Sequence, residues 1–297
     1  MECDVFSSFH PLVNILYFAA VIGLAMFFMH PVNLGISMLC AMVYALYLYG
    51  KKALRMGIFM LPMMIVAAGM NPLFNHQGST ILAHLPNGNP LTLESTMFGI
   101  AAAVVIVTVI VWFSCFNAVM TSDKLIYLLG RVVPALSLIL SMSLRAVPRF
   151  RAQIKIVANA QKCIGRDVSR GNVFQRARHG MRILSIMVTW SLENAIETAD
   201  SMKGRGYGLP KRTAFSIFRF TSRDIYGLIY ILICLIAIIT GGVFEVYRFR
   251  YFPTIRHFYT HEGLMVVLFI VHFMLCAFPL IVNVKEDLIW KRIKSRT

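Results

Sequence analysis

Six long apolar stretches most restrict what this chain can fold into. They cover residues 12–29, 32–49, 56–70, 96–120, 225–243 and 263–284. None of them contains Asp, Glu, Lys or Arg. A helix of roughly 20 apolar residues crosses a bilayer, and 58% of this chain is hydrophobic, a share that soluble domains rarely reach. We therefore predict an all-α integral membrane protein with about six transmembrane helices.

Basic residues between these stretches orient them in the membrane. Lys51, Lys52 and Arg55 place the second connection in the cytoplasm, because cytoplasmic loops are enriched in Lys and Arg. The connection at 71–95 contains neither residue type and is predicted to lie outside. Both termini are then cytoplasmic, which agrees with the basic tail after residue 284. The arginines around residue 250 fall outside in this topology and oppose the rule.

A further apolar run, at 125–144, is not predicted to span the membrane. The charge rule places both of its ends in the cytoplasm, and it contains Arg131 and Pro134, which are unfavourable at a bilayer centre. We expect a helix packed along the membrane surface or against the other helices, with a re-entrant hairpin as the alternative. The cytoplasmic region therefore begins near Ser122.

The region from Arg145 to Arg223 is strongly basic. It holds 16 of the 29 Lys and Arg residues, and the whole chain has a net charge of +16. Because membrane proteins concentrate Lys and Arg in their cytoplasmic parts, this charge does not require nucleic acid as a partner. We predict N-terminal transmembrane helices at 1–121, a cytoplasmic or membrane-surface region at 122–223, and C-terminal transmembrane helices with a basic tail at 224–297.

The first cytoplasmic helix is expected to begin at Pro148, because a proline in the first turn loses no hydrogen bond. This helix is amphipathic, with apolar residues opposite a basic face. A helix lying on anionic lipid would show the same pattern. The basic face holds Arg151, Lys155, Lys162 and Arg166.

A second cytoplasmic helix is predicted from about Asn172 to about Lys203. Ser191, Ala195 and Ala199 place a small residue at every fourth position of its apolar face. Such spacing lets another helix approach closely, so we predict that two long helices cross there. An ordinary core face would have the same spacing.

The second helix ends at the string GRGYGLP. Gly204 and Gly206 can close a helix, and Pro210 prevents its continuation. Arg205 then lies at the negative end of the helix dipole. Two interpretations are open: Arg205 stabilises its own helix end, or its guanidinium projects into an acidic groove of a partner and binds carboxylates there.

The sequence lacks the residues that several classes of protein function need. The chain has no GxxxxGK[ST] or HExxH motif, and its six cysteines lie too far apart for a zinc site or a disulfide framework. The spans hold no charged residue for an ion or proton relay. Four histidines near the outer loops are interpreted as interfacial rather than metal-binding, with an intramembrane enzyme as the alternative. These are His76, His84, His257 and His261.

Residues 191–208, SLENAIETADSMKGRGYG, resemble the signature of the transmembrane T component of energy-coupling factor (ECF) transporters, which are bacterial vitamin and metal importers. Members of this family carry Ala-Arg-Gly or a variant at the end of each of two cytoplasmic coupling helices. Residues 204–206 match the second motif, with Gly in place of Ala. Residues 145–167 are similar to the first coupling helix, where residues 163–165 occupy the motif frame and the arginine follows at Arg166.

The resemblance implies a non-catalytic subunit of an ABC importer in the bacterial cell membrane. Two cytoplasmic ATPases would bind ATP, so this chain itself would hold no cofactor and no metal. The two coupling helices would cross as an X and pass ATPase movement to a membrane S component that binds the vitamin or metal ion. A lipid-binding membrane scaffold and an intramembrane enzyme are the alternative functions. The expected ATPase-docking residues are Gly165, Arg166, Gly204, Arg205 and Gly206, and the expected crossing residues are Ser191, Ala195 and Ala199.

Overall fold

The computed structural model describes residues 4–84, 89–169, 171–209, 218–244, 246, 249–254, 256–257 and 262–294. The chain divides into two compact units. Met1–Leu125 together with Phe218–Thr297 form the membrane unit, and Ile126–Ile217 form the two-helix unit. Each unit has its own hydrophobic core.

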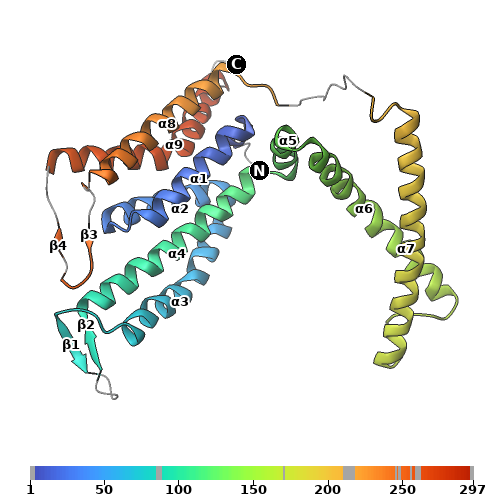
Figure 1. The fold of residues 1–297 in the computed structure, drawn as a ribbon, viewed down its shortest axis with the longest axis horizontal. Coiled ribbons are helices and arrows are strands. Elements are labelled where there is room, and N and C mark those ends of the chain that lie inside the picture. Colours follow the sequence, from blue (N-terminus) through green and yellow to red (C-terminus); the bar gives the residue numbers. More distant parts are fainter. Residues whose placement is uncertain are drawn as a thin grey trace. The chain divides into compact units, whose positions relative to one another are not determined.

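Long apolar helices make up the membrane unit (Figure 1). Five of them, α2, α3, α4, α8 and α9, are long and apolar enough to cross a membrane, and α1 is a shorter apolar helix. The prediction of an all-α integral membrane protein is therefore confirmed, with five candidate spans and α1 as the shorter sixth apolar helix. The helices are α1 (Pro11–Phe27), α2 (Pro31–Tyr49), α3 (Lys51–Phe74), α4 (Leu93–Val119), α8 (Ser222–Val243) and α9 (Glu262–Lys294).

The first two helices begin with the same capping arrangement. Each has a histidine as its N-cap residue and a proline as its first residue, and the imidazole Nδ1 accepts a hydrogen bond from the backbone N–H two residues later. The distances are 3.2 Å from Leu12 to His10 and 3.3 Å from Val32 to His30. Since the following proline needs no partner for its nitrogen, each pair fixes the start of a span.

Two spans, α3 and α9, extend furthest beyond their apolar stretches. The helix α3 begins at Lys51 rather than near residue 56, and α9 continues beyond residue 284 to Lys294. Hydropathy falls at the first charged residues, whereas the backbone hydrogen bonds of a helix continue past them. Long basic side chains at such helix ends can reach water while their stems stay on the apolar surface.

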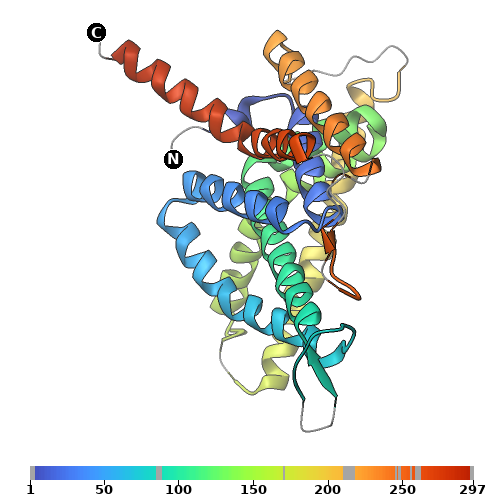
Figure 2. The ribbon, with the colours of Figure 1, turned by 90° about the vertical axis from the view of Figure 1, so that its left-hand side faces the viewer.

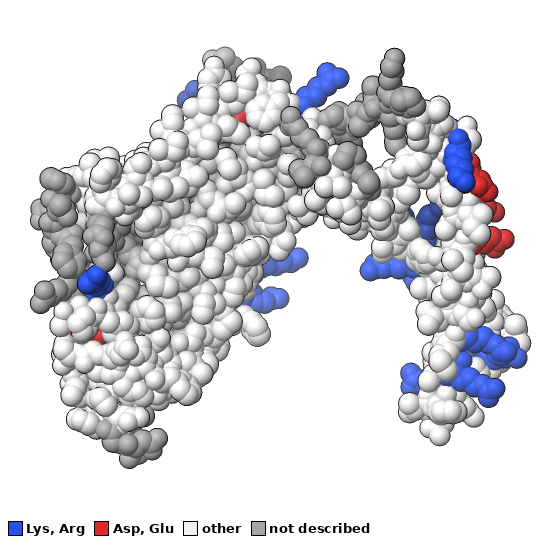
Figure 3. Space-filling model, viewed as in Figure 1, with Lys and Arg blue, Asp and Glu red and all other residues white. Residues whose placement is uncertain are grey.

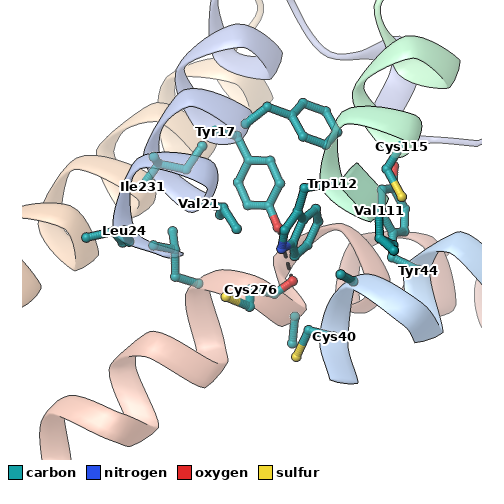
Figure 4. Packing of buried hydrophobic residues seen from close by; sticks show 14 of the residues in the cluster. Tyr17, Val21, Leu24, Cys40, Tyr44, Val111, Trp112, Cys115, Ile231 and Cys276 are labelled. Atoms are coloured by element: carbon teal, nitrogen blue, oxygen red, sulfur yellow. Dashed lines mark hydrogen bonds between the residues drawn. The ribbon is translucent and has the colours of Figure 1, made fainter. Parts of the chain in front are cut away.

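The core of the membrane unit contains buried aromatic rings whose polar ends are satisfied inside the protein. The Tyr17 hydroxyl of α1 donates to the Cys276 carbonyl of α9 at 3.0 Å. The Trp112 indole of α4 donates to the Ser37 hydroxyl of α2 at 3.1 Å. The two rings lie close together at the centre of the cluster (Figure 4). Because lipid offers no hydrogen bonds, these internal partners link four spans.

The helices α3 and α4 lie alongside one another and meet at a small hairpin (Figures 1 and 2). This hairpin pairs β1 (Ile81–His84) with β2 (Pro90–Thr92), and a second pairs β3 (Phe249–Arg250) with β4 (Arg256–His257); both are antiparallel. The Ser79 N–H donates to the Pro253 carbonyl at 3.2 Å, which connects the two loops.

The buried carboxylate of Glu94 binds the loop that leads into β1. Glu94, at the start of α4, is 1% exposed. It accepts hydrogen bonds from the Thr80 hydroxyl at 2.6 Å and the Ser79 hydroxyl at 3.1 Å. The hydroxyl and amide groups of residues 79–80 thus satisfy a charge that would otherwise be unfavourable to bury.

The apolar run at 125–144 does not form one helix. The helix α5 (Ser122–Val132) ends there, Val133 is extended with φ −136° and ψ 90°, and α6 (Pro134–Cys163) begins at Pro134. Pro148 lies inside α6, so the prediction that it opens the first cytoplasmic helix is wrong. Either proline could stand in the first turn of a helix. Because the residue before Pro134 is extended, α5 ends there and α6 begins at Pro134.

The helix predicted from about Asn172 to about Lys203 is confirmed. The helix α7 spans Val173–Gly204, and the Asn172 side chain accepts a hydrogen bond from the Val173 N–H at 2.8 Å. It packs against α6 through a small core in which Val157, Ile183 and Met187 are buried. The rings of Phe150 and Trp190 meet edge to face at the margin of this core, with centroids 5.4 Å apart.

Candidate partner-docking helix tips

The end of α7 is a tightly closed turn. Gly206 has φ +79°, and its N–H donates to the Lys203 carbonyl at 2.9 Å. The Tyr207 N–H donates to the Met202 carbonyl at 3.0 Å. These two bonds define a Schellman motif, in which a left-handed residue satisfies the last carbonyls of the helix. Arg205 is the C-cap residue of this turn and is exposed.

The end of α6 has the same backbone geometry. Gly165 has φ +81°, and its N–H donates to the Lys162 carbonyl at 3.0 Å. The Arg166 N–H donates to the Gln161 carbonyl at 2.9 Å. Two separate helices therefore end in the same rigid turn, each at a glycine that supplies a left-handed conformation. We call these turns the first tip (residues 163–166) and the second tip (residues 204–207).

The two tips carry different side chains on this shared backbone. Ile164 is the C-cap residue of the first tip, where the second tip has Arg205. Arg166 follows Gly165 in the position that Tyr207 takes after Gly206. Ile164 is 65% exposed and Tyr207 is 45% exposed. The sequence prediction did not include Ile164 or Tyr207 among the docking residues, although alignment of the two glycines identifies both.

The first tip is tied to the segment that leads into α7. Lys162 and Asp167 form an ion pair with 3.8 Å between Nζ and Oδ2. The Arg176 Nε donates to the Val168 carbonyl at 2.9 Å, which joins the first turn of α7 to this segment. The cap bonds and these two contacts give the first tip a defined shape, although its side chains are largely at the surface.

Charge is distributed unevenly along α7 (Figure 3). Basic side chains lie in its first half, at Arg176, Arg178 and Arg182. Glu193, Glu197 and Asp200 follow at spacings of four and three and are exposed, so they share one face of the second half. Lys203 and Arg205 are basic again and lie at the C-terminal end of the helix. Positive charge is favourable there because this end of the helix dipole is negative.

The predicted crossing residues are not brought into the contact between α6 and α7. Ser191 is half-buried, and Ala195 and Ala199 are exposed. The observed contact uses Ile183 and Met187 instead. A crossing at the small residues therefore stays a prediction.

The four histidines of the predicted outer loops are not assembled into a metal site within the part of the chain that the structure describes. His84 ends β1, and His76 precedes that strand. His257 ends β4, and His261 lies outside the described residues. His272 is buried in α9 instead, 3.7 Å from the Cys276 sulfur.

Several curated relatives of this chain carry the same description. No protein-family model matches it. The chain is 37% identical over 93 residues to the energy-coupling factor transporter transmembrane protein EcfT of Lacticaseibacillus paracasei, which covers 31% of this chain and 35% of the relative. It is 30% identical over 175 residues to EcfT of Streptococcus equi subsp. equi, which covers 54% of this chain and 63% of the relative.

Other matches agree with these two. EcfT of Streptococcus thermophilus is 37% identical over 103 residues, 34% of this chain and 39% of the relative. The chain thus spans between 35% and 63% of the length of these curated relatives. Together with the multi-pass helical fold, these matches confirm the predicted resemblance of the chain to the transmembrane T component of ECF transporters.

Proposed function

We propose that this chain is the coupling subunit of an ECF-type importer, with both termini in the cytoplasm of a bacterium. Two cytoplasmic ATPases bind and hydrolyse ATP, and this chain passes their movement to a membrane S component that carries a vitamin or a metal ion. The observation that carries the proposal is the pair of matching helix ends: α6 and α7 both close in a Schellman turn with an exposed C-cap side chain.

Such turns suit docking to a partner. A preformed turn loses little conformational entropy on binding, because its backbone is already fixed by its own hydrogen bonds. Arg205 presents a planar guanidinium at the second tip, and this group can bind carboxylates through two parallel hydrogen bonds. The first tip presents Ile164 instead. The proposed grooves on the two ATPases therefore differ in polarity.

The membrane unit supplies the surface on which the S component and lipid would pack. The helix α3 is the least buried of the candidate spans. Only 6% of the residues in its most apolar segment are buried inside the protein. Phe59, Ile65 and Val66 on this helix are all more than half exposed. Apolar side chains of this kind are expected on a span that faces lipid or another membrane subunit.

Copurification from the native cell tests the proposed function. The tagged chain, extracted in mild detergent, should bring down ATP-binding subunits in stoichiometric amount. Arg205→Glu should reduce their yield, since it turns a charge attraction at the tip into repulsion. Arg182→Glu is the matched control, because it makes the same charge reversal at an exposed position of α7 away from the tip. Recovery of the chain alone, or equal yields from both variants, would refute the docking role.

A further inference from the structure

A group of polar side chains is buried inside the membrane unit where α2 packs against α4 and α9. Each helix contributes two of them at a spacing of four residues, which places each pair on one helix face, one turn apart. All of these residues are at most 2% exposed. The pairs are Asn33 and Ser37 on α2, Thr108 and Trp112 on α4, and His272 and Cys276 on α9.

Contacts between α2 and α9 show how their two pairs are aligned. The ring of Phe269 on α9 lies 5.0 Å from the ring of His30, the N-cap residue of α2. About one turn further along both helices, the His272 ring interacts with the Asn33 backbone. Because both sequence numbers rise together, α2 and α9 run in the same direction (Figure 1).

The helix α4 is aligned with α2 in the same way. Val105 of α4 and Leu34 of α2 belong to one small core. About two turns further along α4, Trp112 reaches Ser37 of α2. Thr108 lies between Val105 and Trp112 on α4, so it is level with the first turn of α2, where Asn33 lies. The three pairs therefore form two layers, one turn apart.

The layer of Ser37, Trp112 and Cys276, which we call the bonded layer, is held by direct contacts. The Trp112 indole donates to the Ser37 hydroxyl at 3.1 Å, and the Cys276 thiol interacts with the same hydroxyl. The Cys276 sulfur also lies 3.7 Å from Nε2 of His272 in the other layer. The polar groups of the bonded layer thus satisfy one another.

The layer of Asn33, Thr108 and His272, which we call the unpaired layer, differs in this respect. Oδ1 and Nδ2 of Asn33, Oγ1 of Thr108 and Nδ1 of His272 are buried and make no hydrogen bond to any residue that the structure describes. A buried polar atom without a partner costs roughly 1–3 kcal/mol. Three helices converge on these atoms, so the cost would be concentrated in one place.

We infer that the unpaired layer is a binding site for a buried water molecule that bridges α2, α4 and α9. The Asn33 amide and the Thr108 hydroxyl each donate and accept hydrogen bonds, and a neutral imidazole at His272 offers one donor and one acceptor. Water also does both and makes about three hydrogen bonds when it is buried in a protein. A bridging water satisfies polar groups that do not reach one another directly.

The same side chains disfavour a cation at this site. Neither layer contains a carboxylate, so a buried positive charge would stay uncompensated. Among the described residues, no group of three His, Cys, Asp or Glu side chains is placed to hold a metal ion. The inference does not rest on the proposed function, because all of these contacts lie within the membrane unit.

The sign of one stability change distinguishes a hydrated site from a dry one. Thr108→Val keeps the side-chain shape and removes the hydroxyl. With water bound, this change removes a hydrogen bond and should lower the unfolding temperature of the full-length chain in detergent by roughly 2–4 °C. Without water, valine would replace an unpaired hydroxyl, and the unfolding temperature would stay the same or rise.

Thr96→Val is the matched control on the same helix. The Thr96 hydroxyl donates to the Thr92 carbonyl of its own helix at 3.0 Å, so its loss breaks no contact between helices. This variant should unfold at the wild-type temperature. An unchanged or raised unfolding temperature in Thr108→Val would overturn the water site, and so would an equal fall in both variants.

Radiolytic footprinting detects the water itself. The chain is equilibrated in water labelled with heavy oxygen and irradiated, so that bound water forms hydroxyl radicals which oxidise adjacent side chains. His272 and Cys276 should take up the label several-fold faster than Cys115. Cys115 is the matched control, because it is as buried as Cys276 but lies further along α4, beyond the bonded layer.

A double variant tests whether this label depends on the unpaired layer. Asn33→Leu with Thr108→Val removes three of the four unpaired atoms, and uptake at His272 and Cys276 should fall by roughly tenfold. Thr96→Val should keep the wild-type uptake. Uptake in the folded wild-type chain no faster than at Cys115 would overturn the inference, whether or not ATP-binding subunits copurify with the chain.

Discussion

Ile164 and Arg205 occupy equivalent positions at the ends of α6 and α7. Each is the C-cap residue before a glycine with positive φ, in a turn closed by the same two backbone hydrogen bonds. An apolar and a cationic side chain are thus presented on the same backbone. The two tips match in shape and differ in chemistry, which agrees with the proposal of two ATPase grooves of different polarity.

Substitutions of Ile164 should show which kind of groove the first tip binds. Ile164→Asp should lower the yield of copurified ATP-binding subunit by roughly tenfold or more, because it places a charge in an apolar contact. Ile164→Met keeps the volume and polarity and should retain the yield. Ile164→Arg, which copies the second tip, should also weaken binding. A gain in binding with Ile164→Arg would instead show that the first groove is acidic.

The sequence was sufficient to predict the elements whose signals are local. The predicted bounds of α7 agree with the structure within one residue at each end, because Asn172 caps its start and the glycines around Arg205 close its end. The membrane-spanning helices were predictable from the long apolar stretches of the sequence. The predicted start of the first long helix, at Pro148, is wrong because Pro134 and Pro148 are both suited to the first turn of a helix. Only the extended conformation of Val133 distinguishes the two prolines.

Features that depend on distant contacts were not predictable in this way. Helical periodicity marks a face of α7 that could pack, and Ile183, Met187, Ser191 and Ala195 follow one another along it at every fourth position. Which part of this face is occupied depends on the neighbouring helix, and the structure buries Met187 while Ala195 is exposed. The segment before α1, residues 4–10, is a stronger case. The hydrogen bond from Val5 to Asn283 joins residues 278 positions apart, and no local pattern indicates it.

Gly206 and Gly204 should respond in opposite ways to alanine. Gly206 has φ +79°, so Gly206→Ala should destabilise the closed turn by roughly 1–2 kcal/mol. Gly204 is helical and a Cβ there would meet nothing within 4 Å, so Gly204→Ala should be neutral or stabilising. Copurification of ATP-binding subunits should fall only with Gly206→Ala. Equal yields from both variants would show that docking does not depend on the shape of the turn.

Glu94 should contribute to the stability of the loop before α4 as an ionised acceptor. Glu94→Gln keeps the side-chain shape but removes the charge from the hydrogen bonds with Thr80 and Ser79, so it should destabilise the protein by about 1–3 kcal/mol. Thermal unfolding in detergent measures the change. The exposed Glu193 of α7 gives the matched control, since Glu193→Gln removes a charge without a buried partner. Equal unfolding temperatures for the two variants would contradict a structural role for Glu94.

Gly99 should be required for the close approach of α4 to α3. A Cβ at this position would overlap the Ala68 carbonyl oxygen and lie 3.0 Å from the Asn71 Cβ. The first of these atoms belongs to the backbone of α3, so the two helices would have to move apart, and Gly99→Ala should destabilise the membrane unit by about 1–3 kcal/mol. Gly69→Ala on the facing helix is the control, because a Cβ there would meet nothing within 4 Å. Thermal unfolding in the same detergent should separate the two variants, and a wild-type transition for Gly99→Ala would show that the two helices can move apart without loss of stability.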